Sequence, residues 1–190
     1  MICYTANVRI ISGSLGGRRL RAPRGAATRP TADKVRQALF NILGDVSGAR
    51  VLDLYAGTGA LALESLSRGA ASAVLVDKAA EPVRCIEENA RDLGVVDQVR
   101  VIRADAAAAL ARLRDERFDL VFADPPYDLD PAAVLDALPP LRAPGARVIV
   151  EHDRRHPPGV TETLALADLR RYGDTSISIY GLKQAEDVPA

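Results

Sequence analysis

The chain has 190 residues, of which 48% are hydrophobic and 26% are charged, a composition that indicates a globular domain with a full core. No apolar run is long enough to cross a bilayer, and the first residues lack the charged-then-apolar layout of a signal peptide. The two cysteines, Cys3 and Cys85, make neither a disulfide framework nor a metal site. We therefore expect a cytoplasmic protein with no membrane contact and no bound metal.

The formal net charge of zero hides an asymmetry along the chain. Residues 1–36 contain eight basic side chains and one acid, so they carry +7 and the remaining residues carry −7. A concentrated basic segment is the electrostatic footprint of a partner with a phosphate backbone. A general preference of this protein for arginine over lysine would explain why the basic residues are arginines. It would not explain why residues 1–36 contain so few acids. The candidate nucleic-acid contacts are Arg9, Arg18, Arg19, Arg21 and Arg29.

The N-terminal arm, residues 1–30, has the pattern of a β-hairpin. Residues 8–11 resemble a short strand, residues 12–17 are rich in Ser and Gly, and residues 18–21 return as a second strand. An isolated hairpin is only marginally stable, so we expect it to pack on the main domain or on a partner. A helix is expected over residues 31–43, because Thr31 can cap it and Asp33 is favourable in its first turn.

From residue 50 onward, strand and helix patterns alternate, which predicts an α/β fold with a doubly wound, mostly parallel sheet. The last two strand patterns form an antiparallel pair, so we expect seven strands in one domain, residues 31–183, and then a tail, residues 184–190. The expected strands are 50–54, 73–77, 99–102, 118–123, 147–151, 169–172 and 175–180. The expected helices are 59–68, 81–93, 106–113 and 131–138.

Four of the parallel strands deliver an acid at their carboxyl ends, where open α/β sheets bind ligands. These acids are Asp53, Asp77, Asp105 and Asp124. A single acid at a strand end is usually just solvated, but four on consecutive strands are hard to assign to chance. We therefore expect them to line one pocket.

The fourth of these strands ends abruptly in Asp124-Pro125-Pro126-Tyr127, because proline cannot donate to a sheet ladder. The strand end therefore offers a carboxylate, the free carbonyl of Pro125 and an aromatic ring. Two acceptors and one stacking face suit a flat base that carries an exocyclic amino group. A plain strand followed by a proline turn would explain the two prolines, but not this combination.

Two ligand classes compete for the loop after the first of these strands. Gly57-x-Gly59-x-x-Ala62 matches the dinucleotide fingerprint, but a pyrophosphate seeks bare N–H groups at a helix N-terminus, and Asp53 would repel it. A ligand with a sulfonium and an ammonium group would be attracted by Asp53. S-adenosylmethionine is such a ligand.

On this interpretation, the glycines let the backbone approach the methionine portion of S-adenosylmethionine. Asp77 accepts hydrogen bonds from the ribose hydroxyls, and Asp105 accepts one from the adenine amino group. Asp53 and Asp124 face the cationic groups. The expected cofactor-binding residues are Asp53, Tyr55, Gly57, Gly59, Asp77, Asp105 and Asp124.

Taken in order, the four acids, the glycine loop and Asp124-Pro125-Pro126-Tyr127 resemble the class I S-adenosylmethionine-dependent methyltransferases that modify exocyclic amines. The N-terminal part narrows the resemblance to the bacterial 16S ribosomal RNA guanine-N2 methyltransferases, and it covers about residues 8–180. The motifs that carry it are Arg9-Ile10-Ile11-Ser12-Gly13, Gly17-Arg18-Arg19-Leu20 and Arg29-Pro30-Thr31-x-x-x-Val35-Arg36-x-x-Leu39-Phe40-Asn41. One departure is Ser14-Leu15-Gly16, where relatives often carry a longer or aromatic side chain; it concerns the RNA contacts rather than the chemistry.

The resemblance implies a Rossmann-like methyltransferase fold and a monomer that methylates a guanine of 16S ribosomal RNA, within an assembling small subunit. Asp124 and the Pro125 carbonyl would each accept one N–H of the target amine, and Tyr127 would stack on the base. The base would have to be unstacked or flipped to reach the pocket. The two histidines, His152 and His156, are expected in surface loops.

Two other functions stay open at this point. A DNA adenine-N6 methyltransferase would have a similar pocket, but such enzymes usually carry a dedicated target-recognition segment, for which this chain has little room. A non-catalytic RNA-binding protein of ribosome assembly would retain the fold without the chemistry. The intact acids and the intact Asp-Pro-Pro-Tyr motif argue against that second alternative.

Overall fold

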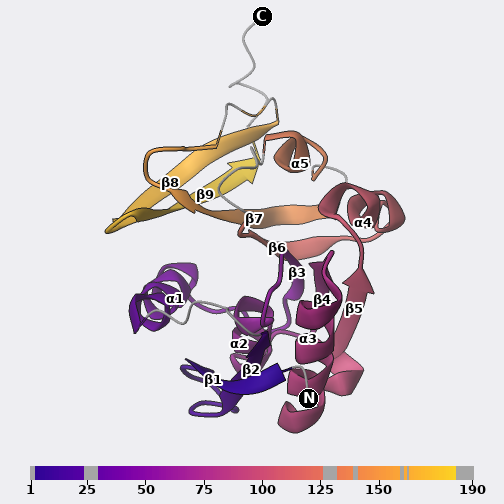
Figure 1. The fold of residues 1–190 in the computed structure, drawn as a ribbon. Coiled ribbons are helices and arrows are strands. Elements are labelled where there is room, and N and C mark those ends of the chain that lie inside the picture. The colour runs from indigo at the N-terminus through magenta and orange to yellow at the C-terminus, as the bar shows by residue number, and fades with distance from the viewer. Residues whose placement is uncertain are drawn as a thin grey trace, which may run out of the picture.

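The computed structural model describes residues 3–23, 30–125, 132–138, 141–158, 161 and 163–182. The predicted N-terminal hairpin is confirmed: β1 (Cys3–Arg9) and β2 (Arg19–Pro23) form a small antiparallel sheet. It lies at the bottom of the molecule in Figure 1, beside α3 (Ala80–Leu93). The expected packing of the hairpin on the main domain is therefore observed.

Within the described residues, the main sheet has seven strands in the order β5-β4-β3-β6-β7-β9-β8. Neighbours from β5 to β7 are parallel, whereas β9 pairs antiparallel with both β7 and β8. The predicted doubly wound, mostly parallel sheet is confirmed. The strands are β3 (Arg50–Leu54), β4 (Ser72–Asp77), β5 (Val99–Arg103), β6 (Phe118–Ala123), β7 (Arg142–Asp153), β8 (Leu164–Tyr172) and β9 (Thr175–Leu182).

Helices cover both faces of this sheet, as Figure 1 shows. One hydrophobic core joins the sheet to α1 (Pro30–Leu43), α2 (Ala60–Ser67), α3 and the hairpin, and the other joins it to α4 (Ala106–Arg112) and α5 (Ala132–Asp136). Neighbouring strand residues alternate between the cores, so Val51 and Phe122 face the first and Leu52 and Val121 the second. Strands that are buried on both faces have nearly continuous apolar sequences. This is why the strands could be distinguished from the amphipathic helices in the sequence.

The order in which the chain adds strands to the sheet reverses between β3 and β6, which are parallel neighbours. From β3 the chain proceeds outward through β4 and β5, and then returns to add β6 and β7 on the other side. Such a switch point leaves a crevice at the carboxyl ends of the strands. It brings together Asp53 on β3 and Asp124, which directly follows β6. Among the described residues, no helix is long and apolar enough to span a membrane.

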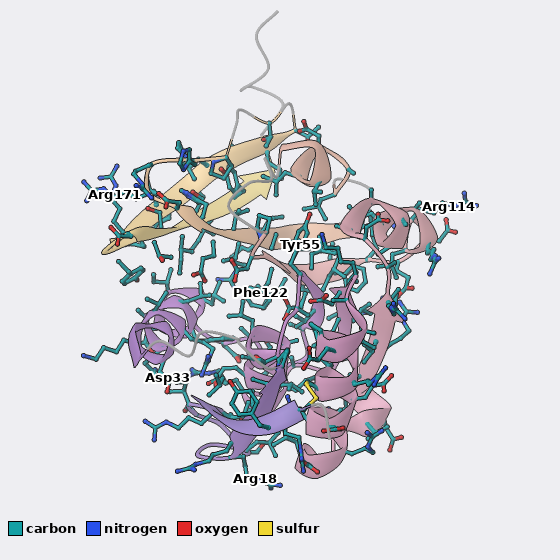
Figure 2. The ribbon with its side chains drawn as sticks, viewed as in Figure 1. Arg18, Asp33, Tyr55, Arg114, Phe122 and Arg171 are labelled. Atoms are coloured by element: carbon teal, nitrogen blue, oxygen red, sulfur yellow. A yellow bond between two sulfur atoms is a disulfide. The ribbon has the colours of Figure 1, made fainter. Side chains whose placement is uncertain are left out.

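Cys3 and Cys85 form a disulfide, although the two cysteines were expected to make no disulfide framework. The bond joins β1 to α3 across 82 positions of sequence, and it appears in yellow in Figure 2. Two cysteines so far apart can be paired only once the path of the chain is known. Because persistent disulfides are typical of oxidising compartments, the cysteine content does not favour a reducing one.

His152 is another correction, because it is buried rather than in a surface loop. The strand β7 continues to Asp153 and carries His152 into the interior, beyond the expected strand end at residue 151. The imidazole Nδ1 lies 2.9 Å from the Asp153 carbonyl oxygen, and Nε2 lies 2.9 Å from Ser178 Oγ. The other histidine, His156, is exposed beyond the strand, as expected.

Candidate active site at the carboxyl edge of the sheet

A cavity of about 600 Å³ opens at the carboxyl edge of the sheet, within the size range of small-molecule sites. It is lined by five of the residues singled out in the sequence: Tyr55, Asp77, Asp105, Asp124 and Pro125. Parallel strands place their carboxyl ends at one edge, which is why acids from distant parts of the chain meet here. The sequence pattern did not identify the remaining lining residues, which are Val76, Lys78, Ala104, Ala106, Ala107 and Val134.

Asp77 holds the loop that follows β3. One carboxylate oxygen accepts a hydrogen bond from the Gly57 backbone N–H at 3.1 Å, and the other accepts one from Ala79 N–H at 2.9 Å. Gly57 has φ 55°, and a side chain there would meet only the Tyr55 carbonyl oxygen, at 4.0 Å. The open space beside this backbone lets a ligand approach it closely.

The second glycine of the loop has a packing role. Gly59 has φ 77°, and a Cβ at this position would lie 2.9 Å from Leu75 Cδ2 and 3.3 Å from Leu63 Cδ1. Glycine therefore lets the loop sit against β4 and α2 at the start of α2. The expected contact between Gly59 and a ligand stays a prediction.

Asp105 closes another side of the cavity. Its carboxylate accepts a hydrogen bond from Ala108 N–H at 2.8 Å, so it caps the N-terminus of α4. Three small side chains line the adjoining part of the cavity: Ala104, Ala106 and Ala107. Because they are small, they leave space for a flat ring. Tyr55 lines the same cavity, and burial together with the charge of Asp105 raises the pKa of its phenol.

Asp53 lies deeper than the other acids, since only 3% of its surface is exposed. Its carboxylate accepts a hydrogen bond from Ala62 N–H at 3.3 Å, at the start of α2. Burial raises the pKa of Asp53 to about 7, and the negative charge of Asp77 adds to this effect. Asp53 is absent from the described residues that line the cavity, so the expectation that all four acids line it is wrong for Asp53. Its expected contact with a cationic ligand group stays a prediction.

Asp124 stands beside a second acid that the sequence pattern did not single out. Ala123 pairs with Val150 across β6 and β7, so Asp124 and Glu151 come next at adjacent strand positions. The residue Asp124 is exposed at the cavity, although protein atoms crowd its carboxyl group. Burial raises the pKa of Asp124, and the charges of Glu151 and Asp53 raise it further. An acid on the fifth parallel strand was the sequence signal that could have identified Glu151.

The arginines proposed to contact nucleic acid differ in their surroundings. Arg21 Nε lies 2.7 Å from an Asp92 carboxylate oxygen, and Arg18, labelled in Figure 2, donates to the Asp92 backbone carbonyl. Arg9 lies 3.4 Å from Asp33. Arg19 is exposed and has no ion pair with any described residue. Three of the predicted residues lie outside the described part of the chain: Arg29, Pro126 and Tyr127.

The sheet order, the switch point and the cavity define the Rossmann-like fold of the class I methyltransferases. The solved structure titled "Putative methyltransferase yhhF from Escherichia coli" superposes on this chain with a TM-score of 0.81 and is 31% identical to it. The match covers 93% of this chain and 98% of that one. The fold is therefore that of the methyltransferases over nearly the whole length of the chain.

Sequence comparison then identifies the family. Residues 8–181 match the family described as "Conserved hypothetical protein 95", and the chain belongs to it. "Putative rRNA methyltransferase YlbH" of Bacillus subtilis is 37% identical over 181 residues, which cover 91% of this chain and 98% of that protein. "Ribosomal RNA small subunit methyltransferase D" of Escherichia coli is 39% identical over 124 residues, which cover 65% of this chain and 62% of that protein.

Proposed function

We propose that this chain transfers a methyl group from S-adenosylmethionine to the exocyclic N2 amine of a guanine in small-subunit ribosomal RNA. The observation that carries the guanine assignment is the pair of acids, Asp124 and Glu151, which follow the paired residues Ala123 and Val150 of neighbouring strands; of the two, Asp124 lines the cavity. Guanine presents N1–H and N2–H donors side by side, and carboxylates accept from both. Adenine places an N1 acceptor next to its amine, which two carboxylates would repel.

The cavity fits S-adenosylmethionine in size and in its polar groups. The open space beside Gly57 suits the close approach of the methionine portion. Asp77 and Asp105 each have lone pairs beyond those used by the backbone, so they can accept from the ribose hydroxyls and the adenine amino group. The alanine wall beside Asp105 leaves room for the adenine ring. When bound, the cofactor would supply a methyl group activated by a sulfonium charge.

The residues of the chain then prepare the amine. The lone pair of the guanine N2 is delocalised into the ring, and Asp124 and the Pro125 carbonyl, each accepting one N–H, would turn that lone pair out of the plane. The nitrogen exchanges one proton for the methyl group. In its ionised form Asp124 can take this proton, and the surroundings that raise its pKa make the carboxylate a stronger base. Tyr127 would hold the base by stacking, so that positioning contributes much of the rate enhancement.

The RNA partner is proposed from the names of relatives and from the basic arm. The two relatives described above are named as an rRNA methyltransferase and as a ribosomal RNA small subunit methyltransferase. The arm of this chain carries a cluster of arginines, as expected for phosphate contacts. We infer a monomer that acts in the cytoplasm on an assembling small subunit; this location follows from the proposed ribosomal RNA substrate and not from the cysteines, which are paired.

The test is methylation of RNA from cells that lack this protein, with labelled S-adenosylmethionine and mapping of the labelled nucleotide. We expect label on the N2 of one guanine in 16S ribosomal RNA. RNA from cells that contain the protein is the matched control, and it should accept little label because the site is already modified. In a parallel reaction with DNA from the same cells, label on adenine, together with no label in the RNA, would instead identify a DNA methyltransferase. RNA binding without any label would identify a non-catalytic assembly protein.

A further inference from the structure

Asn89 on α3 lies between the N-terminal arm and the loop at the cofactor cavity. It is 1% exposed. Its side-chain oxygen accepts a hydrogen bond from Arg21 N–H on β2 at 2.7 Å, and its amide nitrogen donates to the Arg21 carbonyl oxygen at 3.0 Å. The same nitrogen donates to the Thr58 carbonyl oxygen, also at 3.0 Å. One side chain therefore ties the backbone of the arm to the backbone of the Gly57-Thr58-Gly59 loop.

The loop end of this connection reaches the wall of the cavity. Thr58 directly follows Gly57, whose N–H donates to the carboxylate of Asp77, and Asp77 lines the cavity. A short hydrogen-bonded path thus runs from the strand β2, through Asn89 and Thr58, to a proposed cofactor-binding acid. Buried hydrogen bonds of this kind have good geometry in only one arrangement of their partners, so a shift at one end disturbs the other.

Attachment of the arm does not require Asn89, because other contacts already hold it. The disulfide binds β1 to α3, and Arg21 pairs with Asp92 on the same helix. The buried Glu64 of α2 accepts the backbone N–H groups of Ile11 and Ser12 at 2.6 and 3.0 Å. Among the described residues, Asn89 is the side chain whose hydrogen bonds reach both the arm and the Thr58 carbonyl.

We propose that Asn89 is a positioning residue that couples RNA binding on the arm to cofactor binding in the cavity. This inference rests on the proposed function. RNA that fixes β2 would fix the Asn89 amide, which in turn would hold the Thr58 carbonyl and the Gly57 loop in the cofactor-binding conformation. Because coupling between two binding equilibria is reciprocal, bound cofactor would tighten RNA binding by the same factor.

The experiment measures binding without turnover. The dissociation constant for S-adenosylhomocysteine is measured by calorimetry, with and without 16S ribosomal RNA from cells that lack this protein. We expect RNA to tighten this binding by about 5-fold or more in the wild type, the lower end of typical coupling. In Asn89→Ala and Asn89→Asp the ratio should fall towards one. The aspartate keeps the acceptor for Arg21 N–H but cannot donate to Thr58.

Asp92→Ala is the matched control, because it loosens the arm on α3 without touching the loop. It should retain the wild-type ratio even where its RNA affinity falls. A purely structural role for Asn89 predicts a lower melting temperature and an unchanged ratio in both Asn89 variants, which would overturn the inference. If Asn89→Asp does not fold, because it sets a carboxylate oxygen against two carbonyl oxygens, Asn89→Ala decides. A wild-type protein that binds no RNA would refute the proposed function; one that methylates RNA but shows a ratio of one would refute only the coupling.

Discussion

At the scale of single residues, the carboxyl edge of the sheet concentrates negative charge in a confined space. Asp53, Asp124 and Glu151 lie close enough for the charges of the other two to raise the pKa of Asp124. Burial contributes most to the raised pKa values of both Asp53 and Asp124. Such an arrangement costs folding free energy at neutral pH, and a cationic ligand would relieve it. Perturbed acids in a cavity are typical of functional sites.

The replacement Asp124→Ala tests the role of this carboxylate in methyl transfer. We expect the single-turnover rate at saturating cofactor to fall by roughly 10²-fold or more, as for the loss of a preorganised polar contact to a transition state. Asp124→Asn should be less severe for orienting the amine, because its amide oxygen still accepts a hydrogen bond. Calorimetry should show that both variants retain much of their cofactor affinity. A rate near that of the wild type in Asp124→Ala would rule out the assigned role.

Asp53 makes stability depend on pH in a direction that can be worked out. Its pKa rises from 3.8 in the unfolded chain to about 7 in the folded protein, so between these values the folded protein binds more protons. The free energy of unfolding without ligand should therefore fall as the pH rises from about 4 to 7, and then level off.

The variant Asp53→Asn removes this titration. At pH 8 it should be more stable than the wild type by about 2 kcal/mol or more, because a shift of one pKa unit corresponds to about 1.4 kcal/mol. Its stability should also depend less on pH, although Asp124 continues to titrate. Denaturant unfolding at pH 5 and pH 8 measures both effects. A variant with the wild-type dependence on pH would show that Asp53 is ionised throughout.

At the scale of elements, the hairpin is anchored to two helices, α2 and α3, each of which follows a strand that leads to the site. Glu64 of α2 receives two backbone N–H groups from the turn of the arm, and Arg68 contacts the same carboxylate at 2.7 Å. Asn89 of α3 accepts a hydrogen bond from the Arg21 N–H of β2. The helices α2 and α3 begin directly after the Gly57 loop and β4, respectively. The arm is therefore held by helices that are joined in sequence to the loop and the strand at the cavity.

The surroundings of the arm's arginines distinguish a residue that is free to contact RNA from one that stabilises the arm through ion pairs within the protein. Arg19 has no ion pair among the described residues, whereas Arg21 pairs with Asp92 and Glu88. If Arg19 contacts a phosphate, Arg19→Ala should reduce the slope of log affinity against log salt by about 0.7 for single-stranded RNA. The melting temperature should not change.

Arg21→Ala is the matched comparison, and it should mainly lower the melting temperature, because it removes an internal pair. RNA affinity at several salt concentrations, beside thermal melts, distinguishes the two variants. An unaltered salt slope in Arg19→Ala would contradict the phosphate contact. An equal loss of slope in both variants would show that the ion pairs of Arg21 open when RNA binds.

At the scale of the whole molecule, the disulfide closes a large part of the chain into one loop. Cys3 and Cys85 are 82 positions apart, and a cross-link of this span stabilises a protein by about 4 kcal/mol in the chain-entropy description. Reduction should therefore lower the free energy of unfolding by about 2–4 kcal/mol. Guanidinium unfolding with and without a thiol reductant measures this difference. In the double variant Cys3→Ser, Cys85→Ser, the free energy of unfolding should not change when the reductant is added. If it does not change in the wild type either, the disulfide contributes little to stability.

Local patterns along the chain were enough to predict the sheet and the position of its site. Apolar strands alternate with amphipathic helices, and this local periodicity was enough to predict seven strands in a mostly parallel sheet. Once the strands are parallel, their carboxyl ends must share an edge, so the placement of Asp77, Asp105 and Asp124 around one cavity followed directly. These predictions succeeded because each depends on residues that are close in sequence, or on a general rule of topology.

Which distant groups meet could not be predicted in this way, because it depends on how the folded elements pack. The disulfide, the contact of Asn89 with both Arg21 and Thr58, and the ion pair of Arg21 all join residues far apart in the chain. The pairing of Glu151 with Asp124 likewise depends on the register between β6 and β7. Such contacts leave no local periodicity to read, because they arise when packed elements fix the distance and direction between side chains. The sequence therefore located the pocket, whereas packing determined what surrounds it and what it is connected to.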